Sequence, residues 1–146
     1  MHLEAFQAGC NIVGLLKNNI HYGMCCAWAQ MIDYDKLTML LGAQSATGKI
    51  IEKGDILGVS ALAKGQAAIA TKLGEGHSNQ VDKFATIAYS LTQTAILIDH
   101  AKVRMVCEVL DVMHLPVCKA DAFLVLRVLS HNEEPNSLFL NASEVL

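Results

Sequence analysis

The sequence predicts one mainly β domain, in which a sheet closes on itself and short helices lie at one end. Three observations support this prediction. Short apolar segments typical of strands come first, segments with helical spacing interrupt them, and β-branched, Leu-rich strands resume in the C-terminal third. The length of 146 residues fits a single domain, residues 1–146, which needs no disulfide or metal to fold.

The N-terminal third reads as a hairpin followed by another strand. Residues 11–17 and 20–29 are the hairpin strands, and Asn18-Asn19 between them suits a tight turn because Asn tolerates positive φ. A polar loop over residues 33–36 then leads to residues 37–41. This last strand, Leu-Thr-Met-Leu-Leu, has apolar residues on both faces, and we expect it to be central.

Two helices are predicted in the middle of the chain. Residues 45–54 have a suitable N-cap in Ser45 and a suitable stop in Gly54. Residues 64–73 have helical spacing, and Gly74 ends this second helix.

Strands account for most of the rest. Residues 55–61 form a strand between the helices, and residues 82–88 add one or two helical turns. The C-terminal third holds a short strand over 95–98 and longer ones over 103–112 and 122–129.

The charge distribution excludes some partners and favours another. Lys and Arg number 11 against 14 Asp and Glu, and no basic stripe is present, so we expect no nucleic-acid partner. No apolar run reaches the roughly 18 residues of a membrane-spanning helix, so we expect no membrane partner. Charged residues are 17% of the chain against a usual value of about 25%, which favours burial of apolar surface against a second copy.

The N-terminus and the cysteines indicate a compartment. The first six residues lack the basic and then apolar segments of a signal peptide. The chain has five cysteines, an odd number, which we interpret as the reduced thiols of a cytoplasmic protein.

Four stretches together are similar to one known family. Residues 3–6 open the chain, residues 25–28 (Cys-Cys-Ala-Trp) precede a polar loop and an apolar strand, and residues 45–62 contain spaced Ser, Thr, Gly-Asp and Val-Ser. Residues 81–84 then supply an Asp-Lys-Phe signature. In this order the chain resembles the flavin-reductase-like FMN-binding split barrels, above all flavoredoxin and the flavin domains of NAD(P)H:rubredoxin-type oxidoreductases.

The resemblance implies a fold and a function. The fold would be a six-stranded Greek-key split barrel with short peripheral helices, assembled as a homodimer with FMN in a groove at the dimer interface. NADH or NADPH would donate electrons to the flavin, and free flavin or a small rubredoxin-like protein would accept them. Such hydride transfer requires no side-chain acid or base, so no catalytic residue is assigned.

The helix beginning near residue 45 is the candidate phosphate site. A helix N-terminus offers free N–H groups to an anion, hydroxyls add donors, and a lysine, here residue 49 or residue 53, adds charge. The alternative is a capped surface helix without a ligand. The candidate residues, given the resemblance, are Gln44, Ser45, Thr47, Gly48 and Lys49.

The strand beside the flavin ring departs from the family pattern. The family has Asn, Thr or Ser there, whereas this chain has two cysteines, which are weak donors. Backbone groups remain available, and Trp28 either walls the flavin or packs in the protein. The candidate residues are Cys25, Cys26, Ala27, Trp28 and Ala29.

The loop before Asp-Lys-Phe supplies the last candidates, His77, Ser78 and Asn79. The family places polar groups near the cofactor there, although an expected Arg is absent, and a solvated loop is the alternative. We expect Asp82 to act as a cap and Phe84 to hold the loop against the protein. Adjacent cysteines on a strand point to opposite faces and cannot chelate, so no metal site is expected.

Three functions remain open from the sequence. The first is an FMN-binding oxidoreductase. The second is a non-catalytic split-barrel dimer that binds flavin or another flat ligand, which the two cysteines favour. The third is a barrel that has lost its cofactor and keeps only the dimer.

Overall fold

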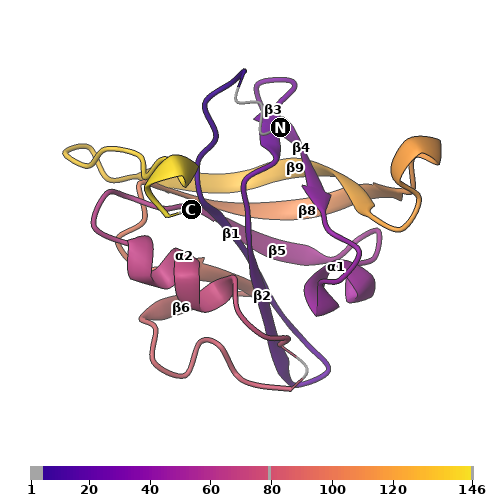
Figure 1. Ribbon diagram of the computed structural model, residues 1–146, viewed down its shortest axis with the longest axis horizontal. Helices are drawn as coiled ribbons and strands as arrows, with labels where there is room; N and C mark the ends of the chain where they lie inside the picture. The colour runs from indigo at the N-terminus through magenta and orange to yellow at the C-terminus, as the bar shows by residue number, and fades with distance from the viewer. Residues whose placement is uncertain (1–4, 79, 146) are drawn as a thin grey trace.

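The computed structural model describes residues 5–78 and 80–145, and within them nine strands form one antiparallel sheet (Figure 1). The sheet order is β3-β4-β9-β8-β5-β1-β7-β6, and β2 also pairs with β1. The strands are β1 (Asn11–Lys17), β2 (Ile20–Cys26), β3 (Ala29–Met31), β4 (Lys36–Leu41), β5 (Ile56–Ala61), β6 (Tyr89–Thr92), β7 (Ala95–Ile98), β8 (Val103–Met113) and β9 (Ala122–Glu133). The helices are α1 (Ala46–Ile50), α2 (Ala67–Leu73) and the 3-10 turns Pro116–Cys118 and Ala142–Glu144.

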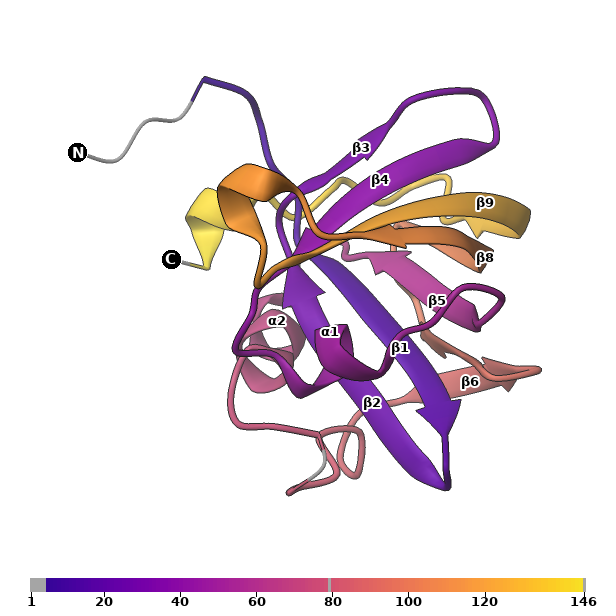
Figure 2. The ribbon, with the colours of Figure 1, turned by 90° about the vertical axis from the view of Figure 1, so that its right-hand side faces the viewer.

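The sheet closes into a barrel because β2 bends and continues as β3. β2 pairs with β1 at one end of the ring, and β3 pairs with β4 at the other. At the bend, the Leu40 N–H donates to the Trp28 carbonyl at 3.0 Å. Counted with β2 and β3 as one bent strand, the ring runs β1, β2–β3, β4, β9, β8, β5. The predicted mainly β, six-stranded split barrel with short helices is therefore confirmed, and the β6–β7 hairpin lies outside the ring (Figure 2).

The first hairpin follows the local sequence closely. β1 pairs with β2 from Lys17↔Ile20 to Asn11↔Cys26, as the predicted strands require. Asn18 and Asn19 have φ values of 53° and 63°, the left-handed conformation of a two-residue turn that favours the twist of hairpin strands. The predicted turn is confirmed.

The main core fills the barrel, and one face of β4 contributes to it. Leu37, Met39 and Leu41 point inward, while the residues between them are half-buried. β4 is central, as predicted, because it pairs with β3 on one side and with β9 on the other.

A second core lies outside the ring, between the sheet, α2 and the β6–β7 hairpin (Figure 1). Ile12, Leu73 and Ile98 are fully buried in it. The strand β7 approaches β5 so closely that a Cβ on Gly58 would lie 2.1 Å from the Ile96 carbonyl oxygen. Only glycine allows this backbone approach.

The helices are shorter than predicted. Ser45 does cap α1, but α1 ends at Ile50, and Gly54, at φ 94°, lies in a following turn. α2 begins at Ala67 and ends before Gly74 as expected. Residues 82–88 form turns rather than helix. Among residues 5–78 and 80–145, none of the helices has the length and hydropathy of a membrane-spanning segment.

The C-terminal strands are longer than predicted and include one that the sequence did not indicate. β8 and β9 pair with each other along almost their whole length, with register shifts near Val106 and Val109. β6 is mostly exposed, and its pairing within the described residues is with β7, so its four residues show no alternation of buried and exposed positions that would predict a strand.

Candidate functional site

A cavity of about 470 Å³ opens between α1, β2 and the loop after α2, and we call it the α1 pocket. It brings together three predicted site residues from two distant segments: Gln44 just before α1, Lys49 within α1, and His77 in the loop. Its full lining is Tyr22, Gln44, Ala46, Lys49, Ile50, His77 and Gln80. Lys49 and Gln44 are exposed, and His77 is half-buried.

The start of α1 is held by its own side chains. The Gly48 N–H donates to Ser45 Oγ at 2.7 Å, and the Ser45 N–H donates to the Gly42 carbonyl at 3.0 Å. Asp121, the residue before β9, accepts the Ala43 N–H at 2.8 Å. The Ser45 hydroxyl is therefore already engaged as a cap, as the alternative reading of this helix expected.

Thr47 and Gly48 also contribute to local packing. Thr47 is only 1% exposed, so it faces the protein rather than the pocket. A Cβ on Gly48 would lie 2.7 Å from Ser45 Oγ, so glycine makes room for the cap. Among the predicted phosphate residues, Gln44 and Lys49 are the ones whose side chains line the pocket.

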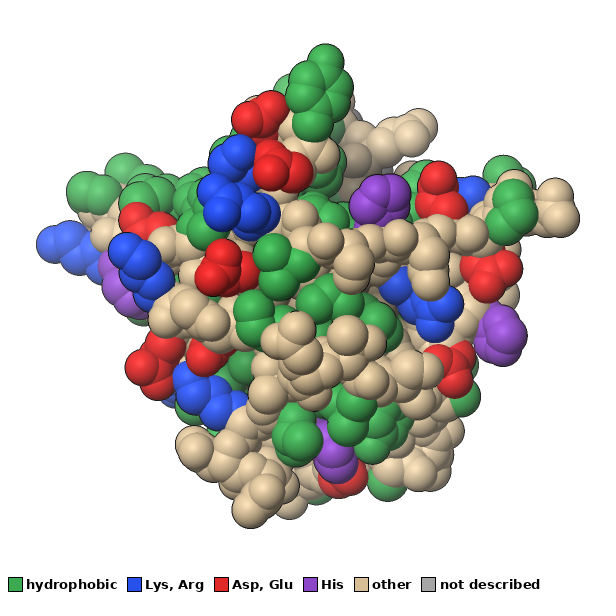
Figure 3. Space-filling view, turned by 180° about the vertical axis from the view of Figure 1, so that it is seen from behind, with side chains coloured by type: hydrophobic (Ala, Val, Ile, Leu, Met, Phe, Trp, Pro, Cys, Tyr) green, Lys and Arg blue, Asp and Glu red, His purple; other side chains and the backbone are tan. Residues whose placement is uncertain are grey.

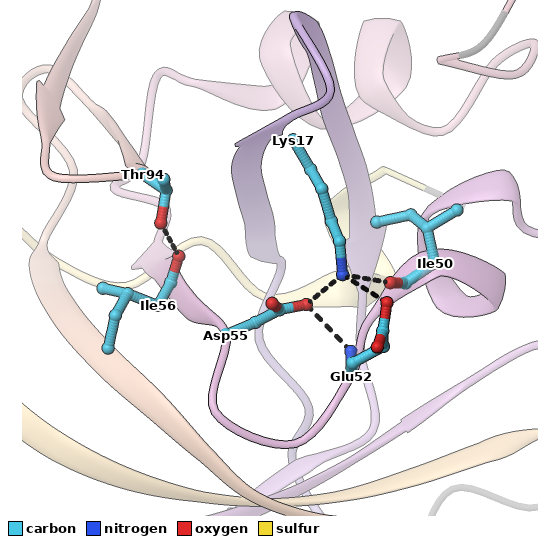
Figure 4. Close-up of polar contacts among 6 residues, drawn as sticks. All are labelled: Lys17, Ile50, Glu52, Asp55, Ile56 and Thr94. Atoms are coloured by element: carbon cyan, nitrogen blue, oxygen red, sulfur yellow. Dashed lines mark hydrogen bonds and ion pairs between the residues drawn. The ribbon is translucent and has the colours of Figure 1, made fainter.

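Lys17 holds the other end of α1 (Figure 4). Its Nζ donates to the Ile50 carbonyl at 2.9 Å, to Glu52 Oε1 at 2.9 Å and to Asp55 Oδ2 at 2.8 Å. Burial lowers the pKa of Lys17, but hydrogen bonds and charge from Asp55 and Glu52 outweigh this and raise it overall. A cation at the last carbonyls also suits a helix C-terminus.

The turn after α1 completes this arrangement. Asp55 Oδ2 also accepts the Glu52 N–H at 2.8 Å, and Thr94 donates to the Ile56 carbonyl at 2.6 Å beside it (Figure 4). Residues of the barrel therefore hold both ends of the α1 segment, and they fix where Lys49 lies in the pocket wall.

The two adjacent cysteines face opposite cores, as predicted for a strand. Cys26 is 4% exposed in the barrel, and its thiol donates to the carbonyls of Trp28 and Leu40 at 3.5 and 3.4 Å. Cys25 packs against the second core. Burial raises the pKa of Cys26 to about 11, and burial with nearby Cys10 and Cys26 raises that of Cys25 to about 12. Both side chains are therefore neutral thiols directed into the protein.

Trp28 and Ala29 lie where β2 bends into β3, and Ala27 before them is half-buried. Trp28 is 68% exposed, so it does not pack in either core. Ala29 lines a second cavity of about 350 Å³ at the barrel mouth, together with Met31, Val59 and Phe139. This cavity shares no lining residue with the α1 pocket.

The loop after α2 has divided roles. His77 enters the α1 pocket, whereas Ser78 is 5% exposed and bonds to the backbone of β2. Its Oγ accepts the Gly23 N–H at 2.9 Å and donates to the Gly23 carbonyl at 3.1 Å. Asn79 lies outside the described residues.

The Asp-Lys-Phe signature acts structurally, as expected for two of its members. Asp82 Oδ1 accepts the Phe84 N–H at 3.0 Å, and Phe84 is 1% exposed in the second core. Both predicted roles are confirmed.

Sequence reasoning missed four residues of the pocket: Tyr22, Ala46, Ile50 and Gln80. Tyr22, Met24 and Cys26 are every second residue of β2, so they share one face of the strand. This alternation alone could have placed Tyr22 on the inner face. Nothing in the neighbouring sequence predicts Gln80 as a pocket residue. Its position depends on a turn in which its N–H donates to the His77 carbonyl. Among the described residues, no group of three or more His, Cys, Asp or Glu is arranged to hold a metal ion.

Several solved structures share the fold of this chain. The NADH:FAD oxidoreductase of Streptomyces globisporus superposes with a TM-score of 0.82 at 17% identity, covering 92% of this chain and 80% of that one. The flavoredoxin of Methanosarcina acetivorans gives 0.78 at 14% identity, covering 97% and 88%. An FMN-binding protein of Thermus thermophilus, with bound 1-cyclohex-2-enone, gives 0.79 at 17% identity, covering 91% and 74%. At these identities the likeness establishes the split-barrel fold.

The family follows from the sequence itself. The model of the flavin reductase like domain matches residues 3–142, which is nearly the whole chain. The chain therefore belongs to the flavin reductase like domain family, as its motifs predicted. No curated protein sequence matches it.

Proposed function

We propose that this protein binds FMN with the phosphate in the α1 pocket, and moves electrons from NADH or NADPH through the flavin to an acceptor. The observation that carries the proposal is the convergence of Lys49 and His77 on one cavity within a chain of the flavin reductase like family. Free flavin or a small rubredoxin-like protein would be the acceptor.

The residues of the α1 pocket suit a phosphate tail. Lys49 supplies a cation, and the amides of Gln44 and Gln80 supply neutral donors. His77 adds a further donor from the opposite wall. The volume of about 470 Å³ lies within the range of small-molecule sites.

The ring would lie beside the bend between β2 and β3. Trp28 is exposed there and offers a flat face, and the backbone of residues 25–29 offers amide groups. When bound there, FMN would supply the hydride and electron transfer. The residues of this chain would bind the tail, orient the ring and shield it from water.

A second candidate is a non-catalytic dimer that binds flavin or another flat ligand. The inward orientation of Cys25 and Cys26 favours it, because their side chains offer the ring no donors. The Thermus thermophilus relative, whose structure holds a small cyclic ketone, supports a ligand of this shape.

One anaerobic titration separates these functions. We expect purified protein to bind FMN and to bleach when NADH or NADPH is added without oxygen. A flavin that stays oxidised favours the second candidate. No flavin binding at all eliminates the first candidate and leaves the second only with another flat ligand. Lys49→Met should weaken FMN about tenfold, the usual effect of losing a charge-assisted bond, and leave riboflavin unchanged.

Assembly and compartment complete the proposal. We infer a homodimer, because large apolar side chains are exposed near the β3–β4 hairpin, and the face seen in Figure 3 has hydrophobic side chains near its centre. The exposed residues of the hairpin region are Trp28, Met31, Ile32 and Tyr34. All five cysteines are free thiols, which is compatible with the cytoplasm.

A further inference from the structure

The outer edge of β2 is covered at Gly23 by the loop that follows α2. Within the described residues, β2 pairs with β1 only, so the N–H and carbonyl of Gly23 face away from the sheet. Ser78 bonds to both groups, and Lys83 Nζ donates to the same carbonyl at 3.2 Å. We call Gly23, Ser78, Lys83 and Phe84 the Gly23 cluster.

Phe84 makes glycine necessary at the centre of this cluster. Its ring lies where a side chain at position 23 would be, since a Cβ there would come within 2.3 Å of Cζ. The Phe84 ring also meets the Tyr89 ring edge-on, with centroids 5.5 Å apart. The aromatic ring therefore fixes how close the loop comes to β2.

Lys83 is unusual because it is a buried cation. It is 5% exposed, and its second acceptor is the carbonyl of Leu73, the last residue of α2, at 3.1 Å. No ion pair among the described residues includes it. Burial lowers the pKa of Lys83, and the C-terminal end of α2 offers the ammonium partial compensation. Burying a charge is expensive, so the buried position of Lys83 indicates a structural role rather than a contribution to solubility.

The Gly23 cluster holds both ends of the turn that begins at His77. The N–H groups of Gln80 and Val81 donate to the His77 carbonyl at 3.0 and 3.1 Å, which closes the turn. Ser78 joins one end to Gly23, and Lys83 joins the other. His77 and Gln80, both in this turn, form one wall of the α1 pocket.

We propose that Lys83 is a positioning residue that holds this turn on β2, and so keeps His77 facing Lys49 across the α1 pocket. The role in ligand binding rests on the proposed function. The contact with Gly23 does not, and it can be tested without any ligand.

The test compares Lys83→Met with Lys72→Met. The first keeps the length of the side chain and removes the ammonium, while the second removes an exposed lysine at the end of α2. In unliganded protein, Lys83→Met should speed hydrogen exchange at the amides of Gly23, Gln80 and Val81. Lys72→Met should leave these amides unchanged. Unchanged exchange in Lys83→Met overturns the proposal.

Flavin binding then tests positioning against general damage. Lys83→Met should weaken FMN about tenfold and leave riboflavin, which lacks the phosphate, unchanged. Lys83→Arg should recover part of the affinity, and adding His77→Ala to Lys83→Met should cause little further loss. Equal weakening of both flavins, or additive losses, overturns the proposal.

A failure of the proposed function and a failure of the role of Lys83 give different results. If the wild type binds neither flavin, the proposed function is wrong, and the exchange experiment alone decides whether Lys83 holds the turn. If Lys83→Met does not fold, Ser78→Ala removes the other contact with Gly23 and must give the same exchange and flavin pattern for the proposal to stand.

Discussion

Lys17 shows how a residue far along the chain can decide where a helix ends. Its ammonium donates hydrogen bonds to the last carbonyl of α1 and to two carboxylates of the next turn. Lys17→Met should lower the free energy of unfolding by about 1–2 kcal/mol, because charge-assisted hydrogen bonds are lost. Urea unfolding measures this, with the exposed Lys53→Met as the control. Equal stabilities of the two variants would contradict the assigned role.

Lys17 also makes the free energy of unfolding depend on pH, and the direction of this dependence follows from its raised pKa. The pKa of Lys17 is raised above the ordinary 10.5, so its contribution is fully present below that pH. It is lost as pH rises through the folded value. Stability should therefore fall at alkaline pH more steeply in the wild type than in Lys17→Met, as measured by unfolding at a series of pH values. Parallel curves would count against this prediction.

The cysteines should react in an order set by burial. Burial raises the pKa of Cys107 to about 12 and that of Cys26 to about 11, whereas Cys118 is half-buried in a surface turn. Native protein treated with iodoacetamide at about pH 8 should be modified at Cys118 first, as read by mass spectrometry. Unfolded protein is the control, in which the order should disappear. Early modification of Cys107 would show that the barrel opens.

At the scale of elements, the approach of β7 to β5 makes a sharp prediction. Gly58→Ala places a methyl group against the Ile96 carbonyl, so it should destabilise the protein by about 2 kcal/mol or more. Gly9→Ala is the matched control, since its nearest neighbour would be at an ordinary 3.7 Å. Chemical unfolding compares them. A tolerated Gly58→Ala would mean that β7 can move away from the barrel.

The elements also show which parts of the fold the sequence predicts. The Asn18-Asn19 turn and the Ser45 cap are set by residues next to each other, so both were predicted. The early end of α1 depends on Lys17, and the pairing of β6 depends on β7, so neither has a local signal. The bend of the predicted strand at Trp28 likewise needs β4 as a partner.

In the candidate site too, the residues that lie in local motifs were predicted, and the contacts between distant segments were not. Lys49 was predicted because it lies within a recognisable helix motif, and His77 because it precedes Asp-Lys-Phe. That Ser78 bonds to Gly23 instead of facing the pocket depends on how close the loop comes to β2, which the sequence does not specify.

At the scale of the whole molecule, the exposed apolar hairpin predicts assembly. Ile32 is 56% exposed and Tyr34 is fully exposed at 102%, so Ile32→Glu should weaken a homodimer through desolvation of the charge. Sedimentation velocity should show a shift toward monomer. Leu91→Glu, on β6 at the far end of the molecule from β3, is the control (Figures 1 and 2). A wild type that sediments as a monomer would rule out the dimer.

The close contact of Phe84 with Gly23 has an evolutionary consequence. A larger residue at position 23 has no space while an aromatic ring occupies its place. Mutations at these two sites should therefore be permitted only in order: first a smaller residue at 84, and then a side chain at 23. In an alignment of family members, the two positions should covary, even though 60 residues of sequence separate the strand from the loop.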